Sequence, residues 1–163
     1  MRRQPINDAG TYKVLGIDPG INGALALVGD GYLAVDHLPT MGSGRQRIIN
    51  AVEISDIIYR WAPDVAVIER VHAMPKQGIS SAFRFGQAFG TLEGVIAGQK
   101  IPLHYVTPQY WKRHYRLPAD KEAARMRAIQ LYPRIADRLL RKKDSDRAEA
   151  LLIAAMHFEG QRQ

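Results

Sequence analysis

The first part of the chain alternates apolar runs with turn residues, which predicts consecutive β-strands. Residues 15–26 read LGIDPGINGALA, with an apolar run on each side of the turn pairs Pro19-Gly20 and Asn22-Gly23. Two β-rich runs joined by such residues are typical of a hairpin. A further turn at 29–31 leads to the apolar run 33–35, so we expect a third strand there.

An amphipathic helix and a buried strand follow the polar loop 40–47. From residue 49 apolar side chains recur near helical spacing up to Trp61, and Pro63 ends this helix. Residues 65–68 (VAVI) are continuously apolar, as expected of a strand covered on both faces, and Glu69 follows them. A strand–helix–strand crossover of this length implies parallel pairing.

The remaining pattern predicts four helices and a fifth strand. The helices cover about 80–98, a segment beginning at Thr107-Pro108, about 120–132, and a segment beginning near 144–146, while residues 103–106 form the strand. We therefore predict an α/β fold with a five-stranded mixed sheet, three antiparallel strands and then two parallel ones, flanked by helices. It forms a single domain over residues 12–160, after a flexible tail at 1–11.

The predicted helix 80–98 carries a glycine every fourth residue, at positions 86, 90, 94 and 98. These glycines share one face, and each costs a helix about 1 kcal/mol relative to alanine. Such a stripe indicates that another backbone packs very close to this face. The neighbour is either the sheet of the same chain or a second subunit.

Composition excludes several classes of site. The chain has no cysteine, which rules out disulfides, zinc–thiolate sites and thiol nucleophiles and fits a cytoplasmic protein. The longest uncharged apolar run, Ala150–Met156, is too short to cross a bilayer, and no hydrophobic segment follows the basic N-terminus. We therefore expect no membrane partner.

The positive charge is concentrated in one segment. The formal net charge is +7, and residues 112–147 carry all of it, with 12 Lys or Arg against 5 Asp or Glu. Such concentration is typical of a protein that binds a polyanion such as nucleic acid. The alternative is a solvated helical face.

Four carboxylates are candidates for one metal site. Asp18 lies in an apolar strand, where its charge needs compensation by a metal ion or by a backbone turn. Glu69 ends a strand that we expect beside it, at the same carboxyl edge of the sheet. Asp146 and Glu149 are spaced i, i+3 and share a helix face. Together these oxygens would suit two divalent cations for phosphodiester hydrolysis.

Each of these acids also has a purely structural interpretation. Asp146 and Glu149 match a capping box at a helix N-terminus. Asp144 could cap the same helix, which we favour, or support the metal site from behind its ligands. Glu69 could simply face solvent. The histidines at 72, 104, 114 and 157 show no metal-ligand spacing, so we interpret them as packed or exposed side chains.

Four motifs in order resemble those of RuvC-type Holliday junction resolvases, particularly the short versions carried by phages. They are GIDPGxxGALA, VAVIE, SAFRFGQAFG and DRAEALLIAAMH, and the resemblance spans roughly residues 13–158. It implies a ribonuclease-H-like fold and a homodimer. It also implies paired cleavage of four-way DNA junctions with Mg²⁺ or Mn²⁺, two ions per active site, leaving nicks that can be ligated.

The resemblance assigns roles to particular residues. Asp18, Glu69, Asp146 and Glu149 become the catalytic, metal-binding acids, with Glu149 in place of the family's usual aspartate. Lys112 and Lys121 match basic positions near the DNA. The full set of candidate DNA contacts is Lys76, Arg84, Lys112, Arg113, Lys121, Arg125 and Lys143. The helix containing SAFRFGQAFG matches the family's dimer contact, which gives the glycine stripe a purpose.

The chain departs from the family in the loop after Glu69. Bacterial resolvases place an aromatic residue three positions after this glutamate, where it helps to open the junction. Here that position is His72, followed by Met74, Pro75 and Lys76. We assign His72 and Met74 to the junction-opening loop, and this departure leaves the preferred cut sequence and the choice between junctions and other branched DNA open.

Three other functions compete with junction resolution. A broader nuclease of the same fold would cut flaps and forks, and a non-catalytic branched-DNA-binding protein would need the basic segment but not the acids. An actin-like or sugar-kinase-like phosphotransferase also begins with an acidic hairpin, but the chain is too short for two such lobes. We therefore expect no nucleotide cofactor.

Overall fold

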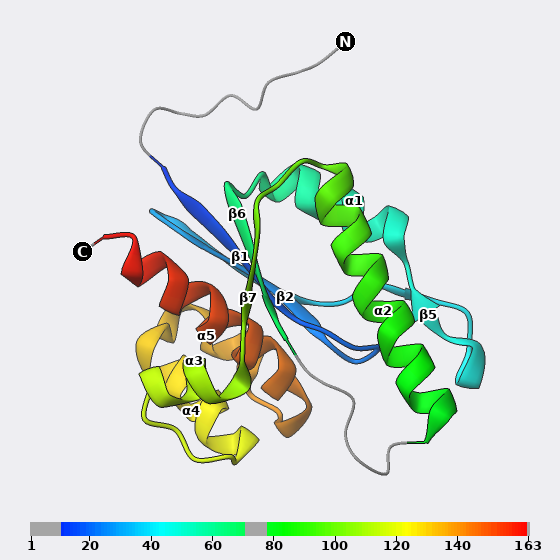
Figure 1. Cartoon of the computed structure of the whole chain (residues 1–163). Coiled ribbons are helices and arrows are strands. Elements are labelled where there is room, and N and C mark those ends of the chain that lie inside the picture. Colours follow the sequence, from blue (N-terminus) through cyan, green and yellow to red (C-terminus); the bar gives the residue numbers. More distant parts are fainter. Residues whose placement is uncertain (1–10, 71–77, 163) are drawn as a thin grey trace.

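The fold is built on the five-stranded mixed sheet that the hydrophobic pattern predicts. The structure is a computed structural model that describes residues 11–70 and 78–162. Strands β1 (Lys13–Asp18), β2 (Ala24–Gly29) and β3 (Tyr32–His37) pair in antiparallel fashion. Strands β6 (Val65–Glu69) and β7 (Leu103–Val106) extend the sheet in parallel, which gives the order β3-β2-β1-β6-β7 (Figure 1).

Helices cover both faces of this sheet (Figure 1). Helices α1 (Ala51–Trp61) and α2 (Ile79–Gly98) pack on one face. The other face holds α5 (Ser145–Gly160), with α3 (Pro108–His114) and α4 (Lys121–Leu131) beside it. As predicted, Thr107 caps α3, and its side chain accepts a hydrogen bond from the backbone N–H of Tyr110.

The alternation of side chains along β1 and β6 decides which residues face α5. Leu15 and Ile17 pack against α1 and α2, whereas Val14 belongs to the core cluster that contains α5. In β6, Val65 and Val67 belong to the α5 side. Because alternate residues of a strand share a face, Asp18 and Glu69 also lie on the α5 side of the sheet.

Helix α5 lies unusually close to β1, and Gly16 makes this approach possible. A Cβ atom on Gly16 would overlap the carbonyl oxygen of Ala150 and lie 2.7 Å from the backbone nitrogen of Ala154. Small residues on both elements therefore bring the helix backbone onto the strand. The first turns of α5 are thereby held near the carboxyl end of β1.

Short elements that the periodicity did not predict lie in two connections. The segment interpreted as the polar loop 40–47 contains β4 (Thr40–Met41), which pairs with β5 (Ile48–Ile49) across a 3₁₀ turn, η1 (Gly44–Gln46). Between α4 and α5 the chain forms two more 3₁₀ segments, η2 (Pro133–Leu139) and η3 (Lys142–Asp144). Strands of two residues are too short to show a period, which explains why this hairpin was missed.

The glycine stripe of α2 does not pack against the sheet. A Cβ atom added to Gly86, Gly90, Gly94 or Gly98 would meet no atom of the described chain within 4 Å. Of the two neighbours considered for this face, the sheet is therefore excluded. The exposed apolar residues Ile79 and Phe83 extend the same side of the helix.

The predicted tail and loop lie partly outside the described residues. Residues 1–10 of the tail are outside them, as are His72, Met74 and Lys76 of the junction-opening loop. Among the helices of the described part of the chain, none is long and apolar enough to cross a membrane.

Candidate active site

Asp18 and Glu69 lie side by side at the carboxyl edge of the sheet. Ile17 pairs with Ile68 in the parallel β1–β6 ladder, so the next residues, Asp18 and Glu69, leave the sheet at the same end. Both carboxylates are nearly buried, with exposed fractions of 7% and 8%. The solvent-facing interpretation of Glu69 is therefore wrong.

The first turns of α5 bring two more acids to this edge. One ligand oxygen from each of Asp18, Asp146 and Glu149 lies within 4.8 Å of the others. We call these three residues and the adjacent Glu69 the acidic cluster. Its members come from two strands and one helix, which is the convergence expected from the sequence.

The buried carboxylates of the acidic cluster repel one another. Burial raises the pKa of Asp18 well above its ordinary value, and the charges of Glu149, Glu69 and Asp146 raise this pKa further. Burial also raises the pKa of Glu69, against the effect of its hydrogen bond from Trp111. Buried acids that repel one another in this way need positive charge beside them.

Two lysines provide part of that charge. The Nζ of Lys121 lies 2.7 Å from Oδ1 of Asp146 and 3.6 Å from Oε2 of Glu149. The Nζ of Lys112 lies 3.6 Å from Oε1 of Glu149. Burial opposes the charge of Lys121, but its hydrogen bond to Asp146 and the neighbouring carboxylates together raise the pKa of its ammonium group.

The acidic cluster also fits a divalent cation. Glu149 is only 4% exposed, and its Oε1 accepts no hydrogen bond from the described residues, the Nζ of Lys112 being 3.6 Å away. A buried carboxylate oxygen without a donor is costly unless a cation compensates it. Carboxylate oxygens are the ligands that Mg²⁺ and Mn²⁺ prefer, so Asp18, Asp146 and Glu149 are suited to hold such an ion, with Glu69 adjacent.

Trp111 is a member of the site that sequence reasoning missed. Its side chain is fully buried, and its indole Nε1–H donates a hydrogen bond of 2.7 Å to Oε1 of Glu69. This bond orients the carboxylate at the end of β6. A buried tryptophan needs an acceptor for its N–H, but the acceptor lies 42 residues away in the sequence.

The capping interpretation of Asp146 and Glu149 is wrong. Helix α5 begins at Ser145 with Asp144 at the N-cap position, so Asp146 is already inside the helix. Asp146 accepts a hydrogen bond from Lys121 instead, and Glu149 points into the acidic cluster. The spacing i, i+3 therefore reflects a shared helix face rather than a capping box.

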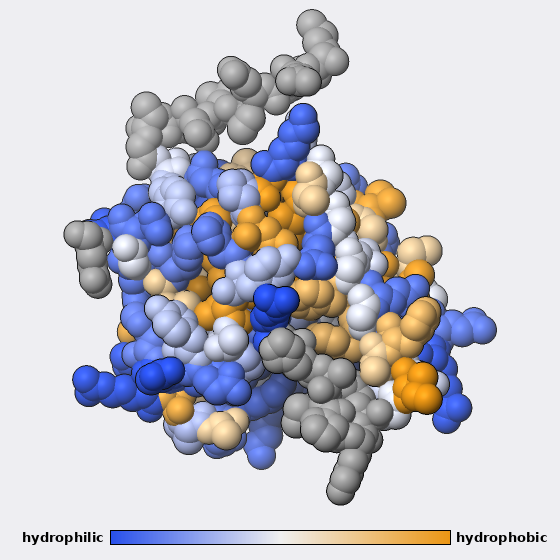
Figure 2. All heavy atoms as spheres, in the orientation of Figure 1, coloured by the Kyte–Doolittle hydropathy of each residue, from blue (hydrophilic) through white to orange (hydrophobic). Residues whose placement is uncertain are grey.

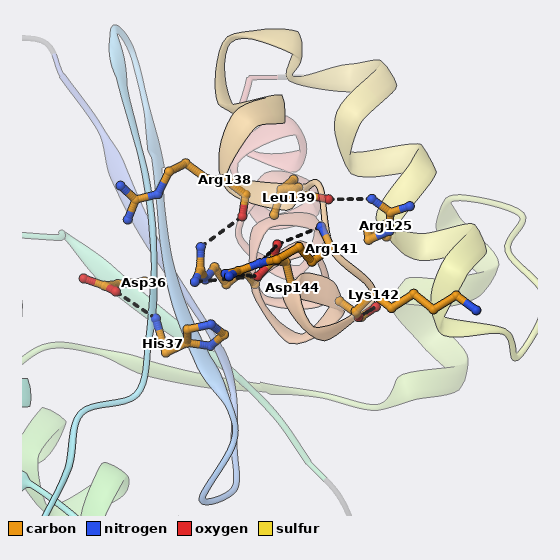
Figure 3. Close-up of polar contacts among 10 residues, drawn as sticks. Asp36, His37, Arg125, Arg138, Leu139, Arg141, Lys142 and Asp144 are labelled. Carbon is orange, nitrogen blue, oxygen red and sulfur yellow. Dashed lines mark hydrogen bonds and ion pairs between the residues drawn. The ribbon is translucent and has the colours of Figure 1, made fainter.

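Asp144 does not cap α5 through its side chain, because it is held by arginines (Figure 3). Its Oδ2 accepts hydrogen bonds from the backbone N–H and Nε of Arg141, and Arg147 Nη2 lies 3.7 Å from Oδ1. Arg147 in turn donates to the carbonyl oxygen of Arg138. Asp144 is only 1% exposed, so this ionic group anchors the start of the helix that carries Asp146.

Sequence comparisons give no relative. No protein-family model matches the chain, and a search of curated proteins finds no match.

Solved structures do match. RuvC of T. thermophilus in complex with a Holliday junction substrate aligns with a TM-score of 0.64 at 20% identity, covering 93% of this chain and 96% of that one. The fowlpox virus Holliday junction resolvase gives 0.57 at 14% identity, with coverages of 92% and 99%. The yeast mitochondrial resolvase Ydc2 gives 0.55 at 18% identity, with coverages of 92% and 81%. This chain shares the fold of these three proteins. The expected ribonuclease-H-like architecture is thereby confirmed.

Within this resolvase fold, the predicted DNA-contacting residues fall into three groups. Lys112 and Lys121 lie against the acidic cluster. Arg113 lines an open surface hollow with Lys112, and Lys143 lines another hollow beside Asp146. Arg84 is exposed on α2, on the far side of the sheet.

Arg125 is the exception among the predicted DNA contacts. Its guanidinium group binds the carboxylate of Glu122 and donates a hydrogen bond of 2.6 Å to the carbonyl oxygen of Leu139. The side chain is only 11% exposed. We therefore leave Arg125 out of the DNA surface proposed below.

Proposed function

We propose that the protein is a metal-dependent, structure-selective DNA endonuclease that resolves four-way junctions by paired hydrolysis of phosphodiester bonds. The observation that carries this proposal is the convergence of Asp18, Glu69, Asp146 and Glu149 beside Lys112 and Lys121. The T. thermophilus RuvC that shares this fold was solved with a Holliday junction substrate, which supports branched DNA as the ligand here.

The acidic cluster and the two lysines beside it have different roles in the proposed reaction. Divalent cations, when bound by these carboxylates, stabilise the charge that develops on a phosphate under attack. The Lys121 side chain is 60% exposed, so its ammonium group is free to move from Asp146 to a phosphate oxygen. Trp111 keeps Glu69 oriented toward the cluster. The catalysis we propose is therefore mainly electrostatic.

The basic segment 112–147 surrounds this site. Figure 2 shows mainly hydrophilic side chains over α3 and α4, the helices that carry Lys112, Arg113 and Lys121. Contacts of this kind bind phosphates without reading bases, so we expect DNA affinity to fall steeply as salt rises. Selectivity then comes from the shape of the branch.

A homodimer built on α2 would match the symmetry of the substrate. The exposed stripe of this helix combines Ile79, 90% exposed, and Phe83, 74% exposed, with the glycines at 86, 90 and 94. The glycines leave room for a second backbone, and the apolar side chains supply surface to bury. A two-fold dimer would present two active sites to the two-fold symmetric junction.

Product mapping tests this function directly. Four-way, flap and linear duplex substrates of equal length are incubated with the protein and Mg²⁺, and the cut positions are read on both strands. We expect symmetrically placed, ligatable nicks in the four-way junction and no cutting of the linear duplex. Faster cutting of flaps would favour the broader branched-DNA nuclease, and binding without any cutting would favour the non-catalytic alternative.

A further inference from the structure

A pocket of about 370 Å³ lies between β5 and α2, away from the acidic cluster. These two elements lie side by side in the structure (Figure 1). Buried Ile49 and Ala88 form its apolar base, and the ring of Phe85, half-buried, lines one wall. The volume suits a small planar ligand rather than a large one.

The rim of this pocket is basic. Arg47 and Arg84 line it, and none of the described residues that line it is acidic. The guanidinium group of Arg47 is held in place, because its Nη2 donates to the carbonyl oxygen of Ile21, at 3.2 Å, and to the side chain of Asn22. A cationic rim around an aromatic wall is the combination that proteins use for unpaired nucleotides.

A second hollow, of about 410 Å³, is lined by residues of this pocket and by one residue of the acidic cluster. Asp146 and Lys143 line one part of it, and Arg47 and Ile21 line another part. Since Arg47 and Ile21 also line the first pocket, the two hollows share a border. Lys143 and Arg47 therefore lie between the acidic cluster and the pocket that Phe85 lines.

The pocket does not compete with the dimer surface on α2. Arg84, Ala88 and Thr91, spaced i, i+4 and i+7, line it from one face of the helix, and Ser81, Phe85 and Gln87 flank this face. Gly86 lies two residues after Arg84, about 200° around the helix, and is therefore on the opposite side. A second subunit centred on Gly86 would leave the face of Arg84 and Ala88 uncovered.

We propose that this pocket is a nucleotide subsite, which accepts one unpaired nucleotide of the branched DNA. The base stacks on Phe85, and the flanking phosphates contact Arg47 and Arg84. The proposal rests on the function proposed above and adds to it a contact by which the protein distinguishes a branch point, where bases are unpaired, from a continuous duplex.

An abasic scan of a four-way junction tests the subsite. Binding is measured without divalent metal, so the result does not depend on cleavage. With the wild-type protein, removing the base at one position near the branch point should weaken binding by roughly 5- to 100-fold, the loss of one base–aromatic stack. Phe85→Leu should weaken binding of the intact junction to the same extent and make it insensitive to that abasic position.

Tyr59 in α1 provides the control for this test. Tyr59→Leu removes an exposed aromatic ring from α1 outside the pocket and should leave the abasic profile as in the wild type. An abasic profile that is flat in the wild type, or unchanged in Phe85→Leu, would overturn the subsite. Since the assay reads binding alone, the absence of cleavage would count against the proposed function and not against this subsite.

Discussion

At the scale of single residues, the site depends on groups that compensate buried carboxylates. Lys112 and Lys121 place ammonium groups against Glu149 and Asp146, and Trp111 donates to Glu69. The hydrogen bond from Trp111 favours the charged form of Glu69, which burial disfavours. The acidic cluster therefore has ammonium groups and a hydrogen-bond donor beside it, all from α3 and α4.

Trp111→Phe tests the positioning of Glu69. The substitution keeps an aromatic ring in the core but removes the Nε1–H donor, so the carboxylate loses its orientation. We expect the Mg²⁺ concentration for half-maximal cleavage to rise by about 10- to 100-fold, as for other residues that orient metal ligands. Trp61→Phe in α1 is the matched control and should leave this concentration unchanged. An unaltered Mg²⁺ dependence in Trp111→Phe would show that the bond does not position Glu69.

At the scale of elements, the site depends on how α5 lies against the sheet. Gly16 admits the backbone of α5 to β1, and the ionic group around Asp144 anchors the helix start. At the other end of α5, His157 packs against His104 of β7, with ring centroids 5.1 Å apart. The same helix therefore couples the acidic cluster to the packing of the whole sheet.

Gly16→Ala tests the close approach of α5 to β1. The added Cβ would meet backbone atoms of Ala150 and Ala154, which cannot rotate away. We expect a loss of about 1–3 kcal/mol in the free energy of unfolding, measured with urea. Gly160→Ala is the control, because a Cβ atom at this position in α5 would meet no atom of the described chain within 4 Å. It should not lower the free energy of unfolding. Equal stability of the two variants would contradict the packing described here.

His157 predicts a specific pH dependence of stability. Burial, and then the charge of His104, lowers the pKa of His157 below its ordinary 6.5. Below about pH 6.5 the unfolded chain binds more protons at His157 than the folded chain does, so the contribution of this residue to the free energy of unfolding falls as pH decreases. Urea unfolding at about pH 7.5 and about pH 5.5 should show a smaller decrease for His157→Gln than for the wild type. Identical decreases would contradict this assignment.

At the scale of the whole molecule, much of the arrangement could be predicted from the sequence. The crossover between the opening strands and residues 65–69 implied parallel pairing, and parallel pairing placed Asp18 and Glu69 at one edge. The hydrophobic period, together with the cap and proline at Thr107-Pro108, also predicted the helices α1 to α5. These features follow from local periodicity together with a single topological rule.

Other features could not be predicted because they depend on contacts between distant residues. The hydrogen bond from Trp111 to Glu69 and the ion pairs of Lys121 with the acids of α5 require the tertiary fold. The role of Asp144 was ambiguous because it lies two residues from Asp146. Only the structure shows that Asp144 binds Arg141 whereas Asp146 belongs to the acidic cluster. The β4–β5 hairpin was too short to leave a periodic signal.

The central claim is that carboxylates from two strands and one helix form a single metal-dependent nuclease site. The most direct measurement compares binding and Mg²⁺-dependent cleavage of a four-way junction by the wild type, Asp18→Asn and Asp56→Asn. The last variant alters an exposed acid of α1 and should behave as the wild type. We predict that Asp18→Asn binds the junction at least as tightly as the wild type, because Lys112 and Lys121 stay in place and no negative charge is added, and does not cut it. Cleavage by Asp18→Asn at the wild-type rate would contradict the claim.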